Sequence, residues 1–470
     1  MKWILKLVLL TILIPPSSMA QNLDDVLTKD KFLWLVYSYH PLSVQSRLLL
    51  DIGESTVLRS RGNFDPYVFS TYDRKEFKGK DYYSIFNGGL KVPTWYGVEL
   101  KTSYDQNNGV FLNPEQSVPV NGLWNAGLSV TLGQGLFIDK RRATLKQAKL
   151  FAEASFFERQ KMMNDLYFDA IKQYWKWFEA YNQYNIYNQS VGLAEERFRA
   201  VKQSFKFGDK PAIDTLEAFI QVQNRQLMRN QLLLNYQNIT ADLSNYLWFE
   251  NNTPLVVTDS LRPPILDTLT LSNSVALDSF YTMLQQLPNT HPDLQLYENK
   301  LASLSIDRRL KSEMLKPTLN VEYNVLNEPI GNDVLAGISG QNNKIGVDFS
   351  FPIFLRKQRG DLQLADLKIS NTTLEQQQKS LEVTNKVKRY YNEHITLQSQ
   401  VGLVSQTVVN TNRLLIAERQ KFNSGESSLF LINSREVYLI NTQIKFAELV
   451  SKYEISRAGF YWSSGVLFTE

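Results

Sequence analysis

The sequence predicts a mainly α-helical protein with a smaller β part, in which the order helix, strands, long helix and return helix occurs twice. Three observations support this fold class. Short matches recur at two fixed spacings, several stretches alternate apolar and polar residues, and two runs of roughly 60 residues contain no proline. The alternation is typical of strands with two unlike faces, and the uninterrupted runs are typical of long helices.

The composition excludes several classes of protein. The chain has 470 residues with 51 Lys+Arg against 47 Asp+Glu, and this near balance does not indicate nucleic-acid binding. The absence of cysteine excludes disulfides, thiolate metal sites, cysteine nucleophiles and acylated lipoprotein anchors. The three histidines are scattered, and the chain has no phosphate-binding loop, nucleophile elbow or zinc-binding helix motif. We therefore expect no enzyme activity, no cofactor and no metal site.

Residues 1–20 are typical of a signal peptide. Lys2 leads into an apolar stretch over residues 4–14, and Ser18 and Ala20 occupy the −3 and −1 positions of a cleavage site. The alternative, a transmembrane anchor, would need a longer apolar stretch than about 11 residues. We expect cleavage after Ala20. Since no other apolar window of 18 residues occurs, we expect no transmembrane helix in the mature chain.

An internal repeat organises the rest of the chain. At an offset of 251 the matches are His40-Pro41 with His291-Pro292, Pro66 with Pro317, and Tyr72 with Tyr323. At an offset of 217 they are Leu136-Phe137 with Ile353-Phe354, Phe205 with Phe422, and Gly208 with Gly425. We therefore predict a first repeat over 21–250, a linker or equatorial segment over 251–290, and a second repeat over 291–470. The fall in offset gives the first repeat 34 additional residues, which lie within 78–123.

The strands are predicted at about 64–135 and about 316–354. Residues 128–132, 319–325 and 345–351 alternate strictly, and the stretch 92–101 is assigned to a strand on the same pattern. Two interpretations fit: a soluble antiparallel sheet packed on helices, or a membrane β-barrel with apolar residues toward lipid and polar residues toward a lumen. The aromatic residues near these stretches fit the interfacial girdles of a barrel. They are Tyr67, Phe69, Tyr72, Tyr82, Tyr83, Trp95 and Trp124.

Two long helices are predicted over 144–207 and 361–423, each about 90 Å long at 1.5 Å per residue. Their apolar residues recur at heptad spacing, which indicates packing along the helix length. In the first helix these are Tyr184, Tyr187, Val191, Ala194, Phe198, Val201 and Phe205. In the second they are Leu397, Val401, Val404, Val408, Leu415 and Phe422.

Each long helix is predicted to reverse at a glycine turn. Gly208 and Gly425 favour the left-handed conformation that ends a helix. Return helices are predicted over 212–248 and 429–462. The chain therefore contains two helical hairpins, 144–248 and 361–462.

This order of parts resembles the TolC-like outer-membrane efflux proteins, or outer membrane factors, over nearly all of the mature chain. The matching motifs are Lys316-Pro317-Thr318-Leu319, Phe351-Pro352-Ile353-Phe354, Gly208 with Asp214-Thr215-Leu216-Glu217-Ala218, and Tyr453-x-x-x-Arg457-Ala458. The resemblance implies a homotrimer in the outer membrane of the cell. Its strands would form one shared β-barrel in outer-membrane lipid, continued by a long periplasmic α-helical barrel.

The resemblance also implies a function. The protein would be the outer-membrane channel of a tripartite efflux or secretion system, conducting passively from a periplasmic adaptor protein and an inner-membrane pump to the exterior. The alternative is a non-channel periplasmic or surface coiled-coil structural protein. The sequence leaves the cargo open among drugs, metal ions, detergents and proteins.

The two glycine turns are the candidate adaptor-docking and gate site. The residues are Phe205, Gly208, Asp209, Lys210, Asp214, Phe422, Gly425, Ser427, Ser428, Leu431 and Ser434. The family's polar gate linkage is not preserved, because Phe422 and Ser427 occupy the positions of its tyrosine and arginine. We therefore expect closure through apolar contacts of Phe422, Leu429, Phe430 and Leu431. Asp214 has a second interpretation, as an ordinary acidic partner of a helix N-terminus.

The insertion within 78–123 is the second departure from the family. It contains Gly88-Gly89 and an alternating stretch, so it fits an extra hairpin. The hairpin would either add barrel strands or form an extracellular or rim lobe. We favour the lobe, because added strands would change how the barrel closes.

Overall fold

The computed structural model describes residues 26–255, 257, 261–266, 271, 273–329 and 339–468. The predicted signal peptide, 1–20, lies outside the described residues. The chain divides into two compact units. Unit 1 comprises residues up to His40, 170–272 and 400–454, and unit 2 comprises 41–169, 273–399 and the residues from 455 onward. Each unit is described by itself below.

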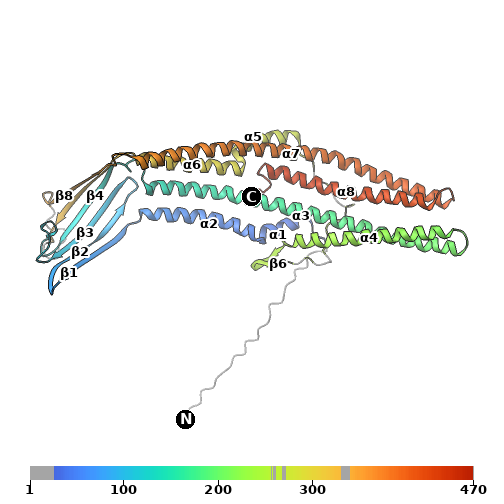
Figure 1. Cartoon of the computed structure of the whole chain (residues 1–470), viewed down its shortest axis with the longest axis horizontal. Coiled ribbons are helices and arrows are strands. Elements are labelled where there is room, and N and C mark those ends of the chain that lie inside the picture. Colours follow the sequence, from blue (N-terminus) through green and yellow to red (C-terminus); the bar gives the residue numbers. More distant parts are fainter. Residues whose placement is uncertain are drawn as a thin grey trace, which may run out of the picture. The chain divides into compact units, whose positions relative to one another are not determined.

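Eight helices occur in the described part of the chain (Figure 1). They are α1 (Lys29–Tyr39), α2 (Pro41–Arg61), α3 (Lys140–Lys206), α4 (Ala212–Ser244), α5 (Leu277–Thr290), α6 (Pro292–Glu313), α7 (Arg356–Asn423) and α8 (Leu429–Ser463). The predicted long helices are present as α3 and α7, each unbroken by proline, and their return helices are α4 and α8. Within the described residues, no helix is both long and apolar enough to cross a membrane.

The strands form one large sheet in unit 2 and a small two-stranded sheet in unit 1. The large sheet consists of β1 (Tyr67–Phe77), β2 (Lys80–Pro93), β3 (Val98–Asn108), β4 (Leu123–Gly133), β7 (Thr318–Asn327) and β8 (Asn343–Ser350). Its order is β1-β2-β3-β4-β7-β8, and all neighbours are antiparallel. Figure 1 shows these strands side by side, so β1 and β8 form its two edges.

The inserted segment supplies two strands of the large sheet. β2 and β3 lie between β1 and β4 and pair with both neighbours along most of their length. The favoured prediction of a separate lobe is therefore wrong. The turn from β1 to β2 is a two-residue loop, Lys78-Gly79, with positive φ at both positions, which is the geometry that joins adjacent antiparallel strands.

The sequence assigned residues 92–101 to one strand, and this is also wrong. β2 ends at Pro93 and β3 begins at Val98. Between them the chain turns at Gly97, whose φ of 77° favours glycine. The backbone N–H of Thr94 donates to the carbonyl of Val98 at 3.0 Å and closes the turn. The apparent alternation therefore runs across a reversal of the chain.

The two faces of the large sheet differ in polarity. Residues that pair directly across strands share a face, so the register defines rows. One row runs Val92, Leu100, Leu128, Tyr323 and Ile345 across five strands. The neighbouring row on the opposite face runs Lys91, Lys101, Gly127, Asn324 and Lys344. The predicted alternation of β4, β7 and β8 is therefore confirmed and extends through β2 and β3.

Three of the predicted girdle aromatics, Tyr67, Phe69 and Tyr83, lie on the polar face. Tyr67 pairs with Lys91, and the Nζ atoms of Lys91 and Lys101 lie 5.4 and 5.6 Å from the ring centroid of Phe69. These rings therefore make cation–π contacts with the lysines. The assignment of Tyr67, Phe69 and Tyr83 to girdles on the apolar face is therefore wrong.

The return helix α4 ends four residues before the predicted residue 248. Trp248 instead lies in β5 (Trp248–Phe249), which pairs with β6 (Thr253–Pro254). The indole N–H of Trp248 donates to the carbonyl of Asn245 at 2.8 Å and stabilises this turn out of the helix. In unit 2, α5 occupies part of the predicted linker 251–290.

Each unit has its own core. In unit 1, Phe32, Trp177 and Leu243 are fully buried, and the indole N–H of Trp177 donates to Thr240 Oγ1 at 3.0 Å. In unit 2, the linker helix α5 packs on α7 and α8. That cluster contains Val275, Phe280, Leu287, Val383, Val387 and Phe460. The burial of Phe280 and Leu287 explains why this part of the predicted linker is helical.

Candidate functional site

The two helix–helix turns of unit 1, residues 204–212 and 421–429, have the same backbone geometry, and we call them the tip. Gly208 and Gly425 have φ of 82° and 78°. The N–H of Asp209 donates to the carbonyl of Ser204, and the N–H of Glu426 donates to the carbonyl of Lys421, both at 2.9 Å. These are the six-to-one bonds of a Schellman ending, so the predicted glycine turns are confirmed.

An apolar cluster lies directly behind the turns. Val201, Ala218 and Leu429 are buried in it, and Phe198 and Phe422 pack against it. The Nζ atom of Lys210 lies 5.0 Å from the ring centroid of Phe422. The structure thus brings together Lys210 and Phe422, two of the predicted site residues from different hairpins.

The four residues expected to close the channel divide into two pairs. Phe422 and Leu429 belong to the apolar cluster within one protomer. Phe430 and Leu431 are 67% and 37% exposed in the single chain. Phe205 is also exposed at the end of α3. Phe430, Leu431 and Phe205 therefore present apolar surface outward, as does Phe207 in the same turn as Phe205.

The polar site residues make mostly local contacts. The hydroxyl of Ser427 donates to Glu418 Oε1 at 2.5 Å, and Ser428 Oγ accepts from the N–H of Leu431 at 3.4 Å. Asp209 and Ser434 are exposed, and Asp214 is half-buried in the first turn of α4. This place favours the interpretation of Asp214 as an N-terminal helix partner.

A buried carboxylate that the sequence analysis missed joins all four helices of the tip. Glu436 of α8 is 3% exposed and accepts hydrogen bonds from Arg197 of α3, Arg225 of α4 and Arg419 of α7. The bonds from Arg197 and Arg225 to Oε2 are both 2.7 Å, and the bond from Arg419 to Oε1 is 2.8 Å. Asn433 adds a contact, accepting from Arg197 at 2.9 Å. We call these residues the Glu436 cluster.

A signal for this cluster exists in the sequence. Leu429, Ile432, Glu436 and Ile440 recur at three- and four-residue spacing on α8, and the four side chains are buried together. A glutamate within such an apolar stripe predicts a buried ionic contact, because an unpaired buried carboxylate is costly.

The arginines decide the protonation state of Glu436. Burial alone would raise the pKa of this carboxyl, but hydrogen bonds and charge from Arg197, and hydrogen bonds from Arg419 and Arg225, lower the pKa to about 2. A lowered folded-state pKa contributes stability that is present above the ordinary value of 4.5 and is lost as pH falls toward 2. The cluster therefore stays ionised at every pH near neutrality.

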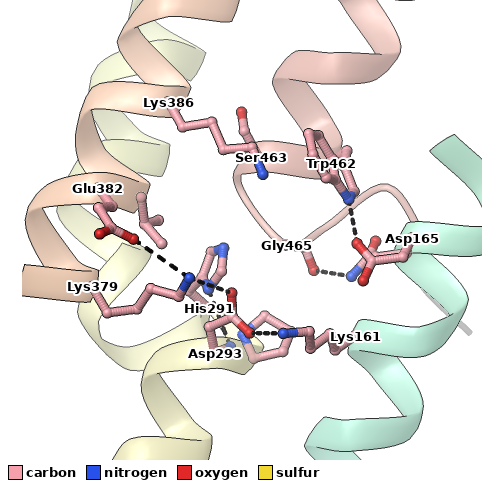
Figure 2. A pocket seen from close by; sticks show the side chains of 13 residues that line it. Lys161, Asp165, His291, Asp293, Lys379, Glu382, Lys386, Trp462, Ser463 and Gly465 are labelled. Carbon is pink, nitrogen blue, oxygen red and sulfur yellow. Dashed lines mark hydrogen bonds and ion pairs between the residues drawn. The ribbon is translucent and has the colours of Figure 1, made fainter. Parts of the chain in front are cut away.

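A cavity of unit 2 with a volume of about 270 Å³ lies between α3, α6, α7 and the end of α8. Figure 2 shows the charged side chains around it pointing toward one another. Lys161 Nζ lies 2.6 Å from Asp293 Oδ1, and the indole N–H of Trp462 donates to Asp165 at 2.6 Å. Lys386 Nζ lies 3.3 Å from the ring centroid of Trp462. These groups satisfy one another, so the cavity is best explained as a junction of helices.

The N-terminus of α6 in this junction depends on a neutral histidine. The backbone N–H of Asp293 donates to His291 Nδ1 at 3.2 Å, so His291 caps the helix. Burial lowers the pKa of His291 to about 4, partly opposed by the charge of Asp293. Since the folded-state pKa is lowered, the associated stability is complete above the ordinary value of 6.5 and is lost as pH falls toward 4.

We expect replacement of His291 by asparagine to reduce the acid sensitivity of the protein. Asparagine is a favourable cap but does not titrate in this range. The measurement is the thermal midpoint from circular dichroism at pH 7 and pH 5, compared with the wild type. The decrease in the thermal midpoint from pH 7 to pH 5 should be smaller in H291N than in the wild type. An equal drop in both proteins would contradict the role given to His291.

Comparison with known proteins shows which proteins share this architecture. A profile of the family described as "Outer membrane efflux protein" matches residues 283–460. No curated protein sequence matches the chain. Among solved structures, the chain is similar to the Campylobacter jejuni CmeC outer membrane channel, with 14% identity and a TM-score of 0.66. That alignment covers 93% of this chain and 86% of the CmeC chain.

Two further outer-membrane proteins are similar over the same share of this chain. The open state of the Neisseria gonorrhoeae MtrE outer membrane channel has a TM-score of 0.68 and 14% identity, with 93% of this chain and 88% of that chain covered. The outer membrane protein VceC of Vibrio cholerae has a TM-score of 0.64 and 11% identity, with 93% and 96% covered. At these identities the similarity shows the fold.

The fold is therefore that of outer-membrane channels, with a β sheet and long helical hairpins, and the predicted fold class is confirmed. Residues 283–460 match the outer membrane efflux protein family, which confirms the predicted resemblance to TolC-like proteins. The partial family match and the shared fold both agree with the predicted outer-membrane efflux channel and do not favour the coiled-coil alternative. The matched family is one of efflux proteins, and the CmeC and MtrE structures are outer membrane channels.

Proposed function

We propose that three copies of this chain assemble into one passive export channel through the outer membrane. The large sheets of the three copies close a shared barrel, and the helical hairpins continue it into the periplasm. The tip docks on a periplasmic adaptor that is linked to an inner-membrane pump. The pump supplies the energy, and the channel conducts passively.

The observation that carries this proposal is the large sheet with one apolar face and two open edges. Leu128, Tyr323 and Ile345 lie exposed in one row of that face in the single chain, where lipid would cover them. Open edges cannot lie in lipid, because the backbone groups of β1 and β8 would lack partners. Known membrane barrels have at least about 8 strands, so the six of one copy are too few.

The alternative is a non-channel coiled-coil structural protein. Such a protein would use the helical hairpins but has no need for a sheet with one apolar and one polar face. The row of Lys91, Lys101 and Lys344 on the opposite face supports a water-filled lumen, because lysines on a lipid-covered face would be costly.

The test is conductance of the purified protein in a planar lipid bilayer. The channel proposal expects stepwise ionic current, with long closed periods that the tip imposes. A scaffold protein that inserts without forming a pore would give no steps. Absence of current both from the wild type and from variants that open the tip would contradict the proposal.

Two tip substitutions should increase this conductance. F422A removes the ring between the apolar cluster and Lys210, and L431D places a charge among the outward apolar residues. If closure depends on apolar packing at the tip, both variants should raise the open time several-fold, F422A by loosening the cluster within each copy and L431D by charging the outward surface. The matched control is L227A, which removes an exposed leucine from α4 away from the turns. Conductance of F422A and L431D at the closed level of the wild type would contradict apolar closure.

A further inference from the structure

We infer that the hairpin β2–β3 widens the membrane barrel of this protein to 18 strands, six from each of three copies. Without that hairpin, each repeat would contribute two strands, β1 with β4 and β7 with β8. Three copies would then close a barrel of 12 strands. This inference rests on the proposed function, because it assumes the trimer that is proposed there.

The repeat itself identifies the hairpin as the added part. At the offset of 251, β1 corresponds to β7, and at the offset of 217, β4 corresponds to β8. In the second repeat β7 pairs directly with β8. In the first repeat β2 and β3 come between the corresponding strands. The 34 additional residues have therefore been placed inside the sheet.

The pairing of the hairpin with its neighbours is continuous. β2 pairs with β1 from Tyr67–Lys91 to Phe77–Lys80, with one irregularity after Lys75, and β3 pairs with β4 from Val98–Val130 to Asp105–Leu123. On the polar face, Asp105 accepts hydrogen bonds from Asn87 of β2 and from Asn125 of β4. The bond from Asn125 is 2.5 Å. One carboxylate of the hairpin thus ties three successive strands together.

The two faces of the hairpin match those of the other strands. On the apolar face, Val92 and Leu100 continue the row of Leu128, and Val98 continues the row of Val130. On the polar face, Glu99 pairs with Ser129, and Lys101 with Gly127. A lobe surrounded by water on both sides would not need this match. The match is what lipid on one side and a water-filled lumen on the other require.

Gly88 and Gly89 are consistent with β2 being a strand of a curved barrel wall. A Cβ atom at Gly89 would lie 2.2 Å from the carbonyl oxygen of Thr102 in β3, so the two backbones approach too closely for any side chain. Glycines within strands often mark bends of a barrel wall.

The number of added strands preserves closure. Adding two strands keeps the count in each copy even, so β1 and β8 still run in opposite directions at the seam between copies. Barrel diameter grows roughly linearly with strand number. An 18-stranded barrel is therefore about one and a half times as wide as one of 12 strands, and barrels of this size leave an aqueous channel.

The experiment uses single cysteines, which are specific labels because the natural chain has none. In β3 the pair is L100C and K101C, which lie on opposite faces. The matched pair in β4 is L128C and S129C. Leu100 pairs with Leu128 on one face, and Lys101 lies on the same face as Ser129. Each variant is labelled in intact outer membranes with a charged maleimide and with a lipid-soluble maleimide, after unheated gels have shown assembled trimer.

We expect K101C and S129C to react with the charged reagent at least tenfold faster than L100C and L128C, and the preference to reverse with the lipid-soluble reagent. Equal reaction of L100C and K101C with the charged reagent, while the β4 pair still alternates, would overturn the inference and leave the proposed function intact. Loss of alternation in both pairs would overturn the proposed function itself. Electron cryomicroscopy of the trimer provides a second measurement, in which 18 strands support the inference and 12 overturn it.

Discussion

Replacing Glu436 with alanine will loosen the tip of this protein. The substitution leaves Arg197, Arg225 and Arg419 without the carboxylate that all three share, and Arg225 is only 4% exposed. Removing one partner of a buried ionic contact costs about 3–5 kcal/mol, because the remaining charge stays buried without a partner. Raising the pKa of Glu436 from about 2 back to 4.5 corresponds to roughly 3 kcal/mol, which agrees with that range.

The measurement is hydrogen–deuterium exchange of the backbone amides in residues 429–440. A loss of 3–5 kcal/mol corresponds to exchange about a hundredfold or more faster, since 1.4 kcal/mol is a factor of ten. E436Q should lie between E436A and the wild type, because the amide oxygen still accepts a hydrogen bond. E426A is the control, since Glu426 is exposed in the turn. Exchange in E436A at the wild-type rate would show that the Glu436 cluster does not hold the tip together.

Placing an arginine on the apolar face of the large sheet will reduce assembly in the outer membrane. Leu128 lies in the middle of β4 and is 41% exposed in the single chain. An arginine facing lipid near the bilayer midplane costs about 2–4 kcal/mol, and L128R repeats this cost in every copy. The measurement is the amount of heat-sensitive oligomer in outer membranes relative to total protein, and we expect a loss of tenfold or more.

The matched control is S129R, one residue along the same strand. Ser129 pairs with Glu99 and Glu322, so an arginine there faces carboxylates on the polar side of the sheet. S129R should assemble like the wild type. If L128R also assembled like the wild type, or if S129R failed equally, the assignment of the two faces to lipid and lumen would be wrong.

The helical part of the fold was predictable because its signals are long and local. Over roughly 60 residues without proline, heptad spacing leaves few alternatives to a helix. The turns at Gly208 and Gly425 were predictable because a positive φ at the end of a helix favours glycine. The end of α4 was missed because the pairing of β5 with β6 is a tertiary contact that the helical pattern does not contain.

The sheet was predictable in its alternation but not in its pairing. Val92 and Val98 alternate in sequence across the turn at Gly97, and only the register shows that they belong to two strands. Phe69 was assigned to an aromatic girdle by residue type alone. Its pairing with Gly89 and its contacts with two lysines show that it lies on the polar face of the sheet. The place of the hairpin between β1 and β4 follows from long-range hydrogen bonds, which a single sequence does not specify.

The candidate site was predictable as a place rather than as a set of contacts. The two turns were identified correctly, and Phe422 does meet Lys210. The buried ionic contacts at Glu436 were missed because two of its three arginine partners are far away in sequence. Arg225 lies 211 residues from Glu436, and Arg197 lies 239 residues from it. These contacts form only when the two hairpins pack against each other, so a local sequence pattern does not predict them.

Fractionation of cells that produce this chain, followed by gel migration with and without heating, tests the central claim most directly. The account predicts that the protein is found in the outer-membrane fraction. Without heating it should migrate as an oligomer of three chains, which heating converts to a single chain slightly smaller than the 54.3 kDa of the full sequence, because the signal peptide is removed. A soluble protein that migrates as a monomer without heating would contradict the account, because one copy cannot close the six-stranded sheet in lipid.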